Sequence, residues 1–147
     1  MTIVVLSGFF NPLHGGHLDM IEGGAGMGDK LVVIVNNDVQ QKLKKGKIIL
    51  EEKNRLRLIS ALRHVDDAVL SIDQDPPVIE TLRLIAKEHP NDEIIFGNGG
   101  NDRRNPKEVP EADVCKEYNI KAVYGVGGTN KHDSSTRINR ATGHEEA

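Results

Sequence analysis

The chain has almost no cysteine, no excess charge of one sign and no long apolar run, and each absence excludes a class of protein. A single cysteine, Cys115, cannot form a disulfide within the chain, and a lone thiol is typical of a reducing compartment. Nineteen Lys and Arg residues against 22 Asp and Glu residues give a net charge of −3. No general basic field therefore points to nucleic acid or an anionic membrane, and we expect any bound anion to be held by a local site.

The first ten residues, MTIVVLSGFF, lack the features of a targeting or membrane segment. They contain no basic region, and their apolar stretch is far shorter than the roughly 20 residues that span a bilayer. We therefore expect a cytoplasmic protein that does not bind membranes. The chain of 147 residues contains no internal repeat or low-complexity tract, which predicts one domain over residues 1–147 that is large enough to bury a core.

Short β-branched runs alternate with segments of helical period, which is the pattern of βαβ units around a parallel sheet. Most runs are continuously apolar, as expected of strands buried on both faces. We predict strands over residues 3–6, 30–36, 67–72, 93–96 and 122–125. We predict helices over residues 17–27, 52–64 and 78–89, around Cys115, and after the N-cap candidates Ser134, Ser135 and Thr136. The predicted fold is a Rossmann-like, doubly wound α/β sheet of five parallel strands.

The most informative stretch is GFFNPLHGGHL, residues 8–18, which directly follows the first apolar run. In a doubly wound sheet the ligand site lies beyond the C-terminal ends of the strands, where the strand order switches, and this turn leads there. Gly8 lets the chain leave the strand, and Gly15 and Gly16 let backbone approach a ligand. The helix beginning near His17 directs unpaired N–H groups into the same crevice, so we expect a phosphate there.

His14 and His17 lie three residues apart in this turn. Two histidines beside a phosphate can donate hydrogen bonds to the charge that builds on an α-phosphoryl group during in-line displacement. Zinc binding is disfavoured, because the glutamate of a His-Glu-x-x-His protease is absent and no third ligand has a suggestive spacing. We therefore expect no metal ligands from protein side chains. For either histidine alone, helix capping or simple solvation remains open.

The string Gly-Phe-Phe-Asn-Pro-Leu-His-Gly-Gly-His resembles the His-x-Gly-His signature of the nucleotidylyltransferase superfamily. The resemblance implies an enzyme that joins a nucleoside monophosphate to an acceptor phosphate and releases pyrophosphate. The cytidylyltransferase branch usually has Phe-Asp where this chain has Phe10-Asn11, and Asn-Pro is closer to nicotinamide or pantetheine adenylyltransferases. The residues that the resemblance assigns to nucleotide binding are Gly8, Phe9, Phe10, Asn11, His14 and His17, with both histidines also catalytic.

A cluster of lysines, Lys42, Lys44, Lys45 and Lys47, follows the second predicted strand. We interpret it as a flexible cationic loop that can close over phosphates, with an ordinary solvated loop as the alternative. The next helix, from Arg55 to LRHVDDAV, resembles a helix of glycerol-3-phosphate cytidylyltransferases, whose upstream lysines bind phosphate. This likeness implies catalytic roles for Lys42 and Arg55 and nucleotide binding by Lys44, and it favours CTP.

Two later tracts complete the predicted site. In GVGGTNKHDSSTRI, hydroxyl residues at a helix start can bind β- and γ-phosphate oxygens, and Ser134-Ser135-Thr136 resembles the second signature of the superfamily. The upstream arginine of that signature is missing, and Asn139 stands where its downstream arginine would be. In FGNGGNDRRN, at the end of the fourth strand, the candidates for contacts to the base or the acceptor are Asn98, Asp102 and Arg103, with a Gly- and Asn-rich turn as the alternative.

The sequence thus predicts transfer of CMP from Mg²⁺-bound CTP to a small acceptor that carries a phosphate or phosphonate. The first alternative is AMP transfer from ATP to an acceptor like phosphopantetheine, nicotinate or nicotinamide mononucleotide, FMN or a heptose phosphate. The second alternative is a nucleotide-binding module without catalysis. The resemblance further implies a homodimer, and we expect no nucleic-acid partner.

Overall fold

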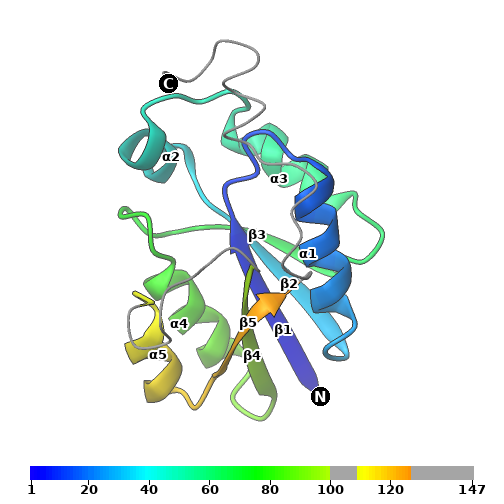
Figure 1. Cartoon of the computed structure of the whole chain (residues 1–147). Helices are drawn as coiled ribbons and strands as arrows, with labels where there is room; N and C mark the ends of the chain where they lie inside the picture. The colour runs from blue at the N-terminus through cyan, green and yellow to red at the C-terminus, as the bar shows by residue number, and fades with distance from the viewer. Residues whose placement is uncertain (100–108, 127–147) are drawn as a thin grey trace.

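The computed structural model describes residues 1–99 and 109–126 (Figure 1). These ranges contain β1 (Thr2–Gly8), α1 (Gly15–Ala25), β2 (Lys30–Val35), α2 (Asp38–Lys45), α3 (Glu52–Ser60), β3 (Asp67–Leu70), α4 (Ile79–Glu88), β4 (Glu93–Gly99), α5 (Ala112–Glu117) and β5 (Lys121–Val126). The predictions for Asp102, Arg103, Ser134, Ser135 and Thr136, and for a last helix, lie outside the described residues and stay predictions.

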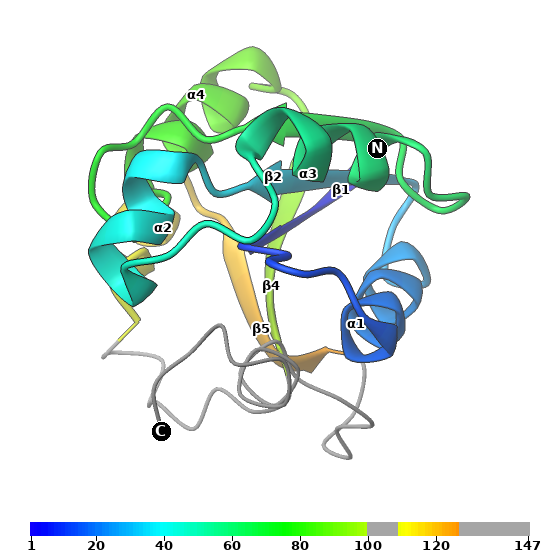
Figure 2. The same ribbon diagram turned by 90° about the horizontal axis from the view of Figure 1, so that it is seen from above.

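The five strands form one parallel sheet in the order β3-β2-β1-β4-β5, which confirms the predicted doubly wound α/β fold. The chain builds outward from β1 to β3 on one side, and then returns to add β4 and β5 on the other. The strand order therefore switches between β1 and β4, and a crevice for ligands is expected at the C-terminal ends of these two strands. Figure 2 looks down on that edge and shows two segments there: the turn between β1 and α1, and helix α2.

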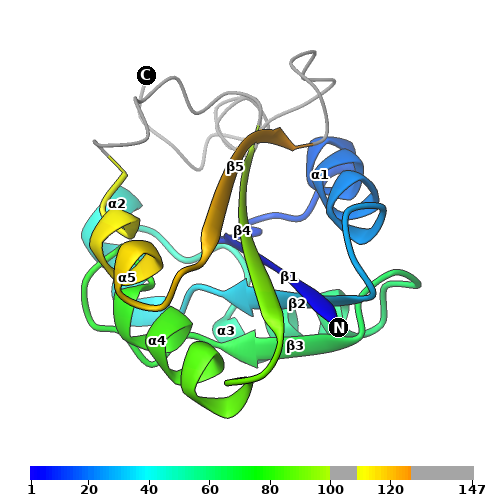
Figure 3. The ribbon, with the colours of Figure 1, turned by 90° about the horizontal axis from the view of Figure 1, so that it is seen from below.

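Alternate residues of the central strands pack into two separate core layers, as the continuously apolar strands predicted. On one face, Ile3 and Val5 of β1 pack with α4 and α5, and on the other face Val4 and Leu6 pack with α1 and α3. Figure 3 shows α4 and α5 together on one side of the sheet and α1 on the other. Cys115 lies in the first of these layers, where burial raises the pKa of its thiol to about 11.

The predicted helix ends need correction at α1 and α3. Helix α1 begins two residues earlier than predicted, because His14 rather than a later residue is its N-cap. Helix α3 ends at Ser60 instead of residue 64, and the following residues form tight turns, with the N–H of Val65 donating to the carbonyl of Leu62. No helix in the described ranges has the length and hydropathy required to cross a bilayer.

Helix α2 corrects the prediction of a flexible cationic loop, which was wrong. Asn37 is its N-cap: the side chain accepts from the N–H of Gln40, and the Gln40 side chain accepts from the N–H of Asn37, which makes a capping box. Gly46 ends the helix with a φ of 76°, a conformation that favours glycine. The lysines of the cluster are therefore held in fixed relative directions, except for Lys47, which follows the helix.

Candidate active site

The side chains of His14 and His17 form a capping box at the first turn of α1. The N–H of Gly16 donates to Nδ1 of His14 over 3.0 Å, and the N–H of His14 donates to Nδ1 of His17 over 3.2 Å. The two rings stack with their centroids 3.8 Å apart. Helix capping, which the sequence left open for either residue alone, thus holds for both, and it fixes the two imidazoles side by side at the N-terminus of α1.

This capping also determines which ring nitrogen carries hydrogen. A nitrogen that accepts a hydrogen bond bears no hydrogen, so each neutral imidazole has its hydrogen on Nε2. Each histidine therefore uses its acceptor nitrogen within the turn and has its donor nitrogen on the other side of the ring. Two adjacent N–H donors at a helix N-terminus are suited to neighbouring oxygens of a phosphate chain.

Phe10 and Gly8 support this pair from inside the protein. The Phe10 ring is buried and meets the His17 ring edge to face, with centroids 4.9 Å apart. A Cβ at Gly8 would lie 2.7 Å from the Phe10 ring, so glycine at this position makes room for phenylalanine. The contacts of these two residues are internal ones that orient His17, and their direct binding to nucleotide stays a prediction.

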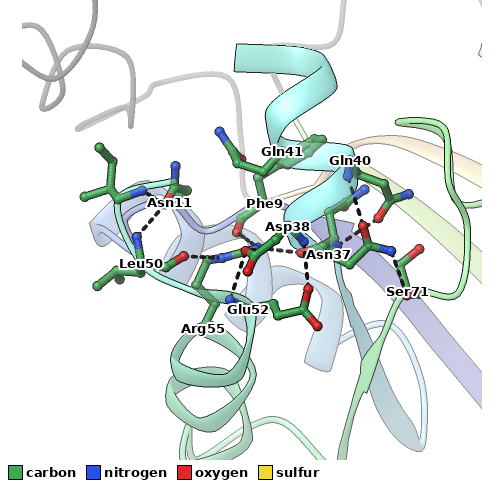
Figure 4. Close-up of polar contacts among 12 residues, drawn as sticks. Phe9, Asn11, Asn37, Asp38, Gln40, Gln41, Leu50, Glu52, Arg55 and Ser71 are labelled. Atoms are coloured by element: carbon green, nitrogen blue, oxygen red, sulfur yellow. Dashed lines mark hydrogen bonds and ion pairs between the residues drawn. The ribbon is translucent and has the colours of Figure 1, made fainter. Parts of the chain in front are cut away.

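Asn11 holds the segment that joins α2 to α3 (Figure 4). Its Oδ1 accepts from the N–H groups of Ile49 and Leu50 at 2.9 and 2.8 Å, and its Nδ2 donates to the carbonyl of Lys47 at 3.4 Å. An ionised aspartate would keep the acceptor and lose the donor. These hydrogen bonds to residues 47–50 give a structural reason for Asn rather than Asp at this position, and nucleotide binding by Asn11 stays a prediction.

Arg55 is fully buried and joins several elements below the site. It donates from Nε to the carbonyl of Leu50, from Nη1 to the carbonyls of Phe9 and Asn36, and from Nη2 to Oδ1 of Asp38. Four of its five N–H groups are thus taken by the protein. These contacts describe a positioning residue, and direct contact between Arg55 and a phosphate stays a prediction that the buried side chain does not support.

Helix α2 separates the two predicted lysines. Lys44 shares the inner face of the helix with the buried residues Gln40 and Gln41, and its Nζ lies 4.6 Å from the centroid of the Phe9 ring. Both lysines are exposed, but Lys42 is two positions away, or about 200° around the helix. The structure therefore places Lys44 against Phe9 of the histidine turn (residues 8–18), and Lys42 on the opposite face of α2.

Two buried side-chain atoms have no hydrogen-bond partner in the described part of the chain: Nδ2 of Asn98 and Oε1 of Gln41. An unpaired buried polar group costs about 1–3 kcal/mol, so each calls for an explanation. Asn98 lies at the C-terminal end of β4, beside the switch in strand order, where the sequence predicted a substrate contact. Gln41 was not predicted, because its segment was interpreted as a loop; as a helix, that segment places Gln41 and Lys44 on one face.

Metal-binding groups are sparse in the same part of the molecule. In residues 1–99 and 109–126, no three side chains of His, Cys, Asp or Glu lie close enough together to hold a metal ion. The polar groups at the turn are imidazole nitrogens and the ammonium of Lys44. These groups suit phosphate oxygens.

The switch in strand order, the N-terminus of α1 and the paired histidines together fit an α/β protein of the nucleotidyltransferase type. The chain belongs to the cytidylyltransferase-like family, whose model matches residues 5–140. The family that the histidine motif resembles is therefore confirmed.

Curated relatives cover parts of the chain. FAD synthase of Methanothrix thermoacetophila is 41% identical over 85 residues, which are 58% of this chain and 57% of that protein. The bifunctional protein HldE of Streptomyces coelicolor is 33% identical over 124 residues, which are 83% of this chain and 25% of that protein. The chain thus matches little more than half of the first relative and a quarter of the second.

Two solved structures share the fold. The lipopolysaccharide core biosynthesis protein of Thermoplasma volcanium aligns with a TM-score of 0.68 and 29% identity, over 90% of this chain and 99% of that one. A putative nicotinate-nucleotide adenylyltransferase of Vibrio parahaemolyticus aligns with a TM-score of 0.62 over 99% of this chain and 89% of that one. Its identity of 16% makes it evidence for the fold alone.

Proposed function

We propose that the chain transfers AMP from Mg²⁺-bound ATP to a small acceptor that carries a phosphate or phosphonate. The observation that carries nucleotidyl transfer is the His14–His17 pair, whose two Nδ1 atoms are held by the turn at the N-terminus of α1. The choice of AMP is supported by the name of the FAD synthase relative, because FAD consists of FMN joined to AMP.

CMP transfer from CTP, the first expectation from the sequence, is the second candidate. It was favoured by the likeness of the helix that begins near Arg55 to that of glycerol-3-phosphate cytidylyltransferases, and ATP was favoured by Asn11. The hydrogen bonds of Asn11 go to residues 47–50, and those of Arg55 go to Leu50, to Asp38 and to the carbonyls that follow β1 and β2, so these contacts give no reason to prefer one base over the other.

The proposed reaction is a single in-line displacement. An oxygen of the acceptor phosphate attacks the α-phosphorus of the nucleotide, a new P–O bond forms, and the bond to the β-phosphate oxygen breaks. Pyrophosphate leaves with the electron pair of that bond. The attacking oxygen is already anionic, so no general base is required, and catalysis consists of positioning and electrostatic stabilisation.

The residues of the turn supply that stabilisation. Nε2–H groups of His14 and His17 donate to the α-phosphate and to the bridging oxygen, where negative charge grows during the displacement. Lys44, held over Phe9, adds a positive charge beside the phosphates. Because imidazole nitrogens and an ammonium suit phosphate oxygens, Mg²⁺ in this proposal is bound through the triphosphate, where it supplies charge neutralisation.

The assay that tests the proposal measures pyrophosphate release with each of the four nucleoside triphosphates. The acceptors are FMN, nicotinate mononucleotide, glycerol 3-phosphate and a heptose phosphate. We expect release with ATP and one acceptor. Release of pyrophosphate with CTP alone would show that the transferred group is CMP and not AMP. Nucleotide binding without release in any combination would overturn nucleotidyl transfer in favour of a non-catalytic binding module.

A cytoplasmic location and a homodimer belong to the same proposal. The first rests on the lone cysteine and the second on likeness to relatives of this size.

A further inference from the structure

Two neighbouring glutamines on α2, Gln40 and Gln41, are both buried and use their amides differently. The Oε1 of Gln40 accepts from the N–H of Asn37, and its Nε2 donates to the carbonyl of Asp75 at 2.7 Å and faces two further carbonyls of the same loop. The amide of Gln40 is thus fully paired. Gln41 donates from Nε2 to the carbonyl of Lys47 at 3.1 Å, and its Oε1 has no partner among the described residues.

The contacts of Gln41 place it on the side of α2 next to the histidine turn. The Lys47 carbonyl that it binds also accepts from Asn11, three residues before His14. One turn further along the helix, Lys44 lies over the Phe9 ring. In Figure 4, Gln41 projects from α2 toward Asn11, whereas Gln40 lies on the side of Asn37 and Ser71.

We propose that Oε1 of Gln41 accepts a hydrogen bond from an O–H or N–H group of a bound substrate. The bond from Nε2 to Lys47 fixes the orientation of the amide, so the oxygen cannot exchange places with the nitrogen without losing that bond. An amide oxygen is an acceptor only, and it would repel the oxygens of a phosphate. The group that it binds is therefore in the part of the substrate that carries no phosphate.

Two sources offer such a donor: a hydroxyl or ring N–H of the acceptor, and a hydroxyl or amino group of the nucleoside. The proposal rests on nucleotidyl transfer at the neighbouring turn. Gln41 is thus a substrate-binding residue that accepts a hydrogen bond from the part of the substrate next to the phosphate. Lys44, on the same helix face, neutralises the charge of the phosphate itself. Asn98, with an unpaired donor on β4, offers the complementary group on the other side of the switch point.

The test compares Gln41→Met and Gln41→Glu with the matched control Gln40→Met. Isothermal titration calorimetry measures binding of ATP, CTP, FMN, nicotinate mononucleotide and glycerol 3-phosphate one at a time, and a thermal melt monitors folding. We expect Gln41→Met to weaken binding of either the nucleotide or the acceptor about five- to tenfold, on the scale of one hydrogen bond, and to leave the other unchanged. Gln41→Glu, which keeps an acceptor oxygen, should restore part of that loss.

The identity of the weakened ligand tells the two sources of the donor apart. Gln40→Met should lower the melting temperature without a selective effect on either ligand. Wild-type affinity of Gln41→Met for every probe would overturn the proposal, and so would an unselective loss that follows the melting temperature, as in Gln40→Met. Calorimetry needs no turnover, so a protein that binds nucleotide but releases no pyrophosphate contradicts the proposed reaction and still tests Gln41. A wild-type protein that binds none of the probes contradicts both.

Discussion

The turn after β1 and the α2–α3 segment meet at the same edge of the sheet and use their polar side chains in opposite ways. In the turn, each histidine uses Nδ1 to hold the backbone and has a second ring nitrogen with its own hydrogen. In the α2–α3 segment, Arg55 is fully buried and donates to four protein oxygens. Both regions carry residue types that chemistry on phosphates requires.

The difference shows that a side chain's hydrogen bonds to the protein, and not its residue type alone, indicate whether it supports the site or belongs to it. Arginine beside a phosphate site is the more obvious binder by residue type, because its guanidinium matches phosphate geometry. Arg55 nevertheless supports the turn through the carbonyl of Phe9, and Gln41, a residue of neutral type, keeps an unpaired oxygen. Four substitutions test this contrast.

The largest effect is expected for Arg55→Met. It removes the buried side chain that donates to three carbonyls and leaves Asp38 without its cation, so the free energy of unfolding should fall by about 3–5 kcal/mol. Urea titration measures this change. Arg57→Met, on the exposed face of the same helix, is the control and should stay within about 0.5 kcal/mol of wild type. An Arg55→Met protein of normal stability and low turnover would show that Arg55 acts on the substrate.

His17→Ala should lower kcat by about 100-fold, because it removes a donor that acts on charge developed in the transition state. Its stability should fall by only about 1 kcal/mol, the scale of a lost helix cap. Steady-state kinetics and a thermal melt measure the two effects. His64→Ala, at an exposed position, should change neither. A normal kcat for His17→Ala would show that His17 caps the helix and has no catalytic role.

Lys44→Met should raise KM for the triphosphate about tenfold, since it removes the charge that lies over the Phe9 ring. Lys42→Met, on the opposite face of the helix, should leave KM and kcat as in wild type. The pair is measured under identical salt conditions, because charge effects are screened by ions. Equal effects of the two substitutions on KM would mean that Lys44 and Lys42 do not differ in function, although they lie on opposite faces of α2.

Asn11→Asp is expected to have the smallest effect, a loss of about 1 kcal/mol in stability. The carboxylate keeps the two bonds from Ile49 and Leu50 and loses the donor to Lys47. The ratio of kcat/KM for ATP to that for CTP should not change, because the hydrogen bonds of Asn11 hold residues 47–50. A shift of this ratio toward CTP would show that Asn11 contributes to recognition of the nucleotide base.

The sequence predicted the sheet and the histidine turn because their signals are local. Continuous apolar runs marked the strands, and the glycines around His14 marked a helix start. Helix α2 was missed since its apolar residues, Val39 and Leu43, are exposed at 57% and 62%, and its buried face consists of glutamines. The signals that would have found it were Asn37 followed by Gln40, which form the capping box, and the glycine at position 46.

The buried, positioning role of Arg55 could not be predicted from such local signals. Its burial depends on carbonyls at the ends of β1 and β2, which lie far from it in sequence and meet it only in the folded sheet. The sequence shows a residue's chemistry, and the fold decides how many of its hydrogen bonds are already used.

A test of nucleotidyl transfer follows the α-phosphorus itself. Wild-type protein is incubated with Mg²⁺, an acceptor that supports pyrophosphate release, and ATP that is radiolabelled in parallel reactions at the α- or the γ-phosphorus. Nucleotidyl transfer predicts that α-label appears joined to the acceptor and γ-label in pyrophosphate, with both rates reduced about 100-fold in His17→Ala. γ-Label on the acceptor, or α-label found only in free AMP or ADP, would contradict it.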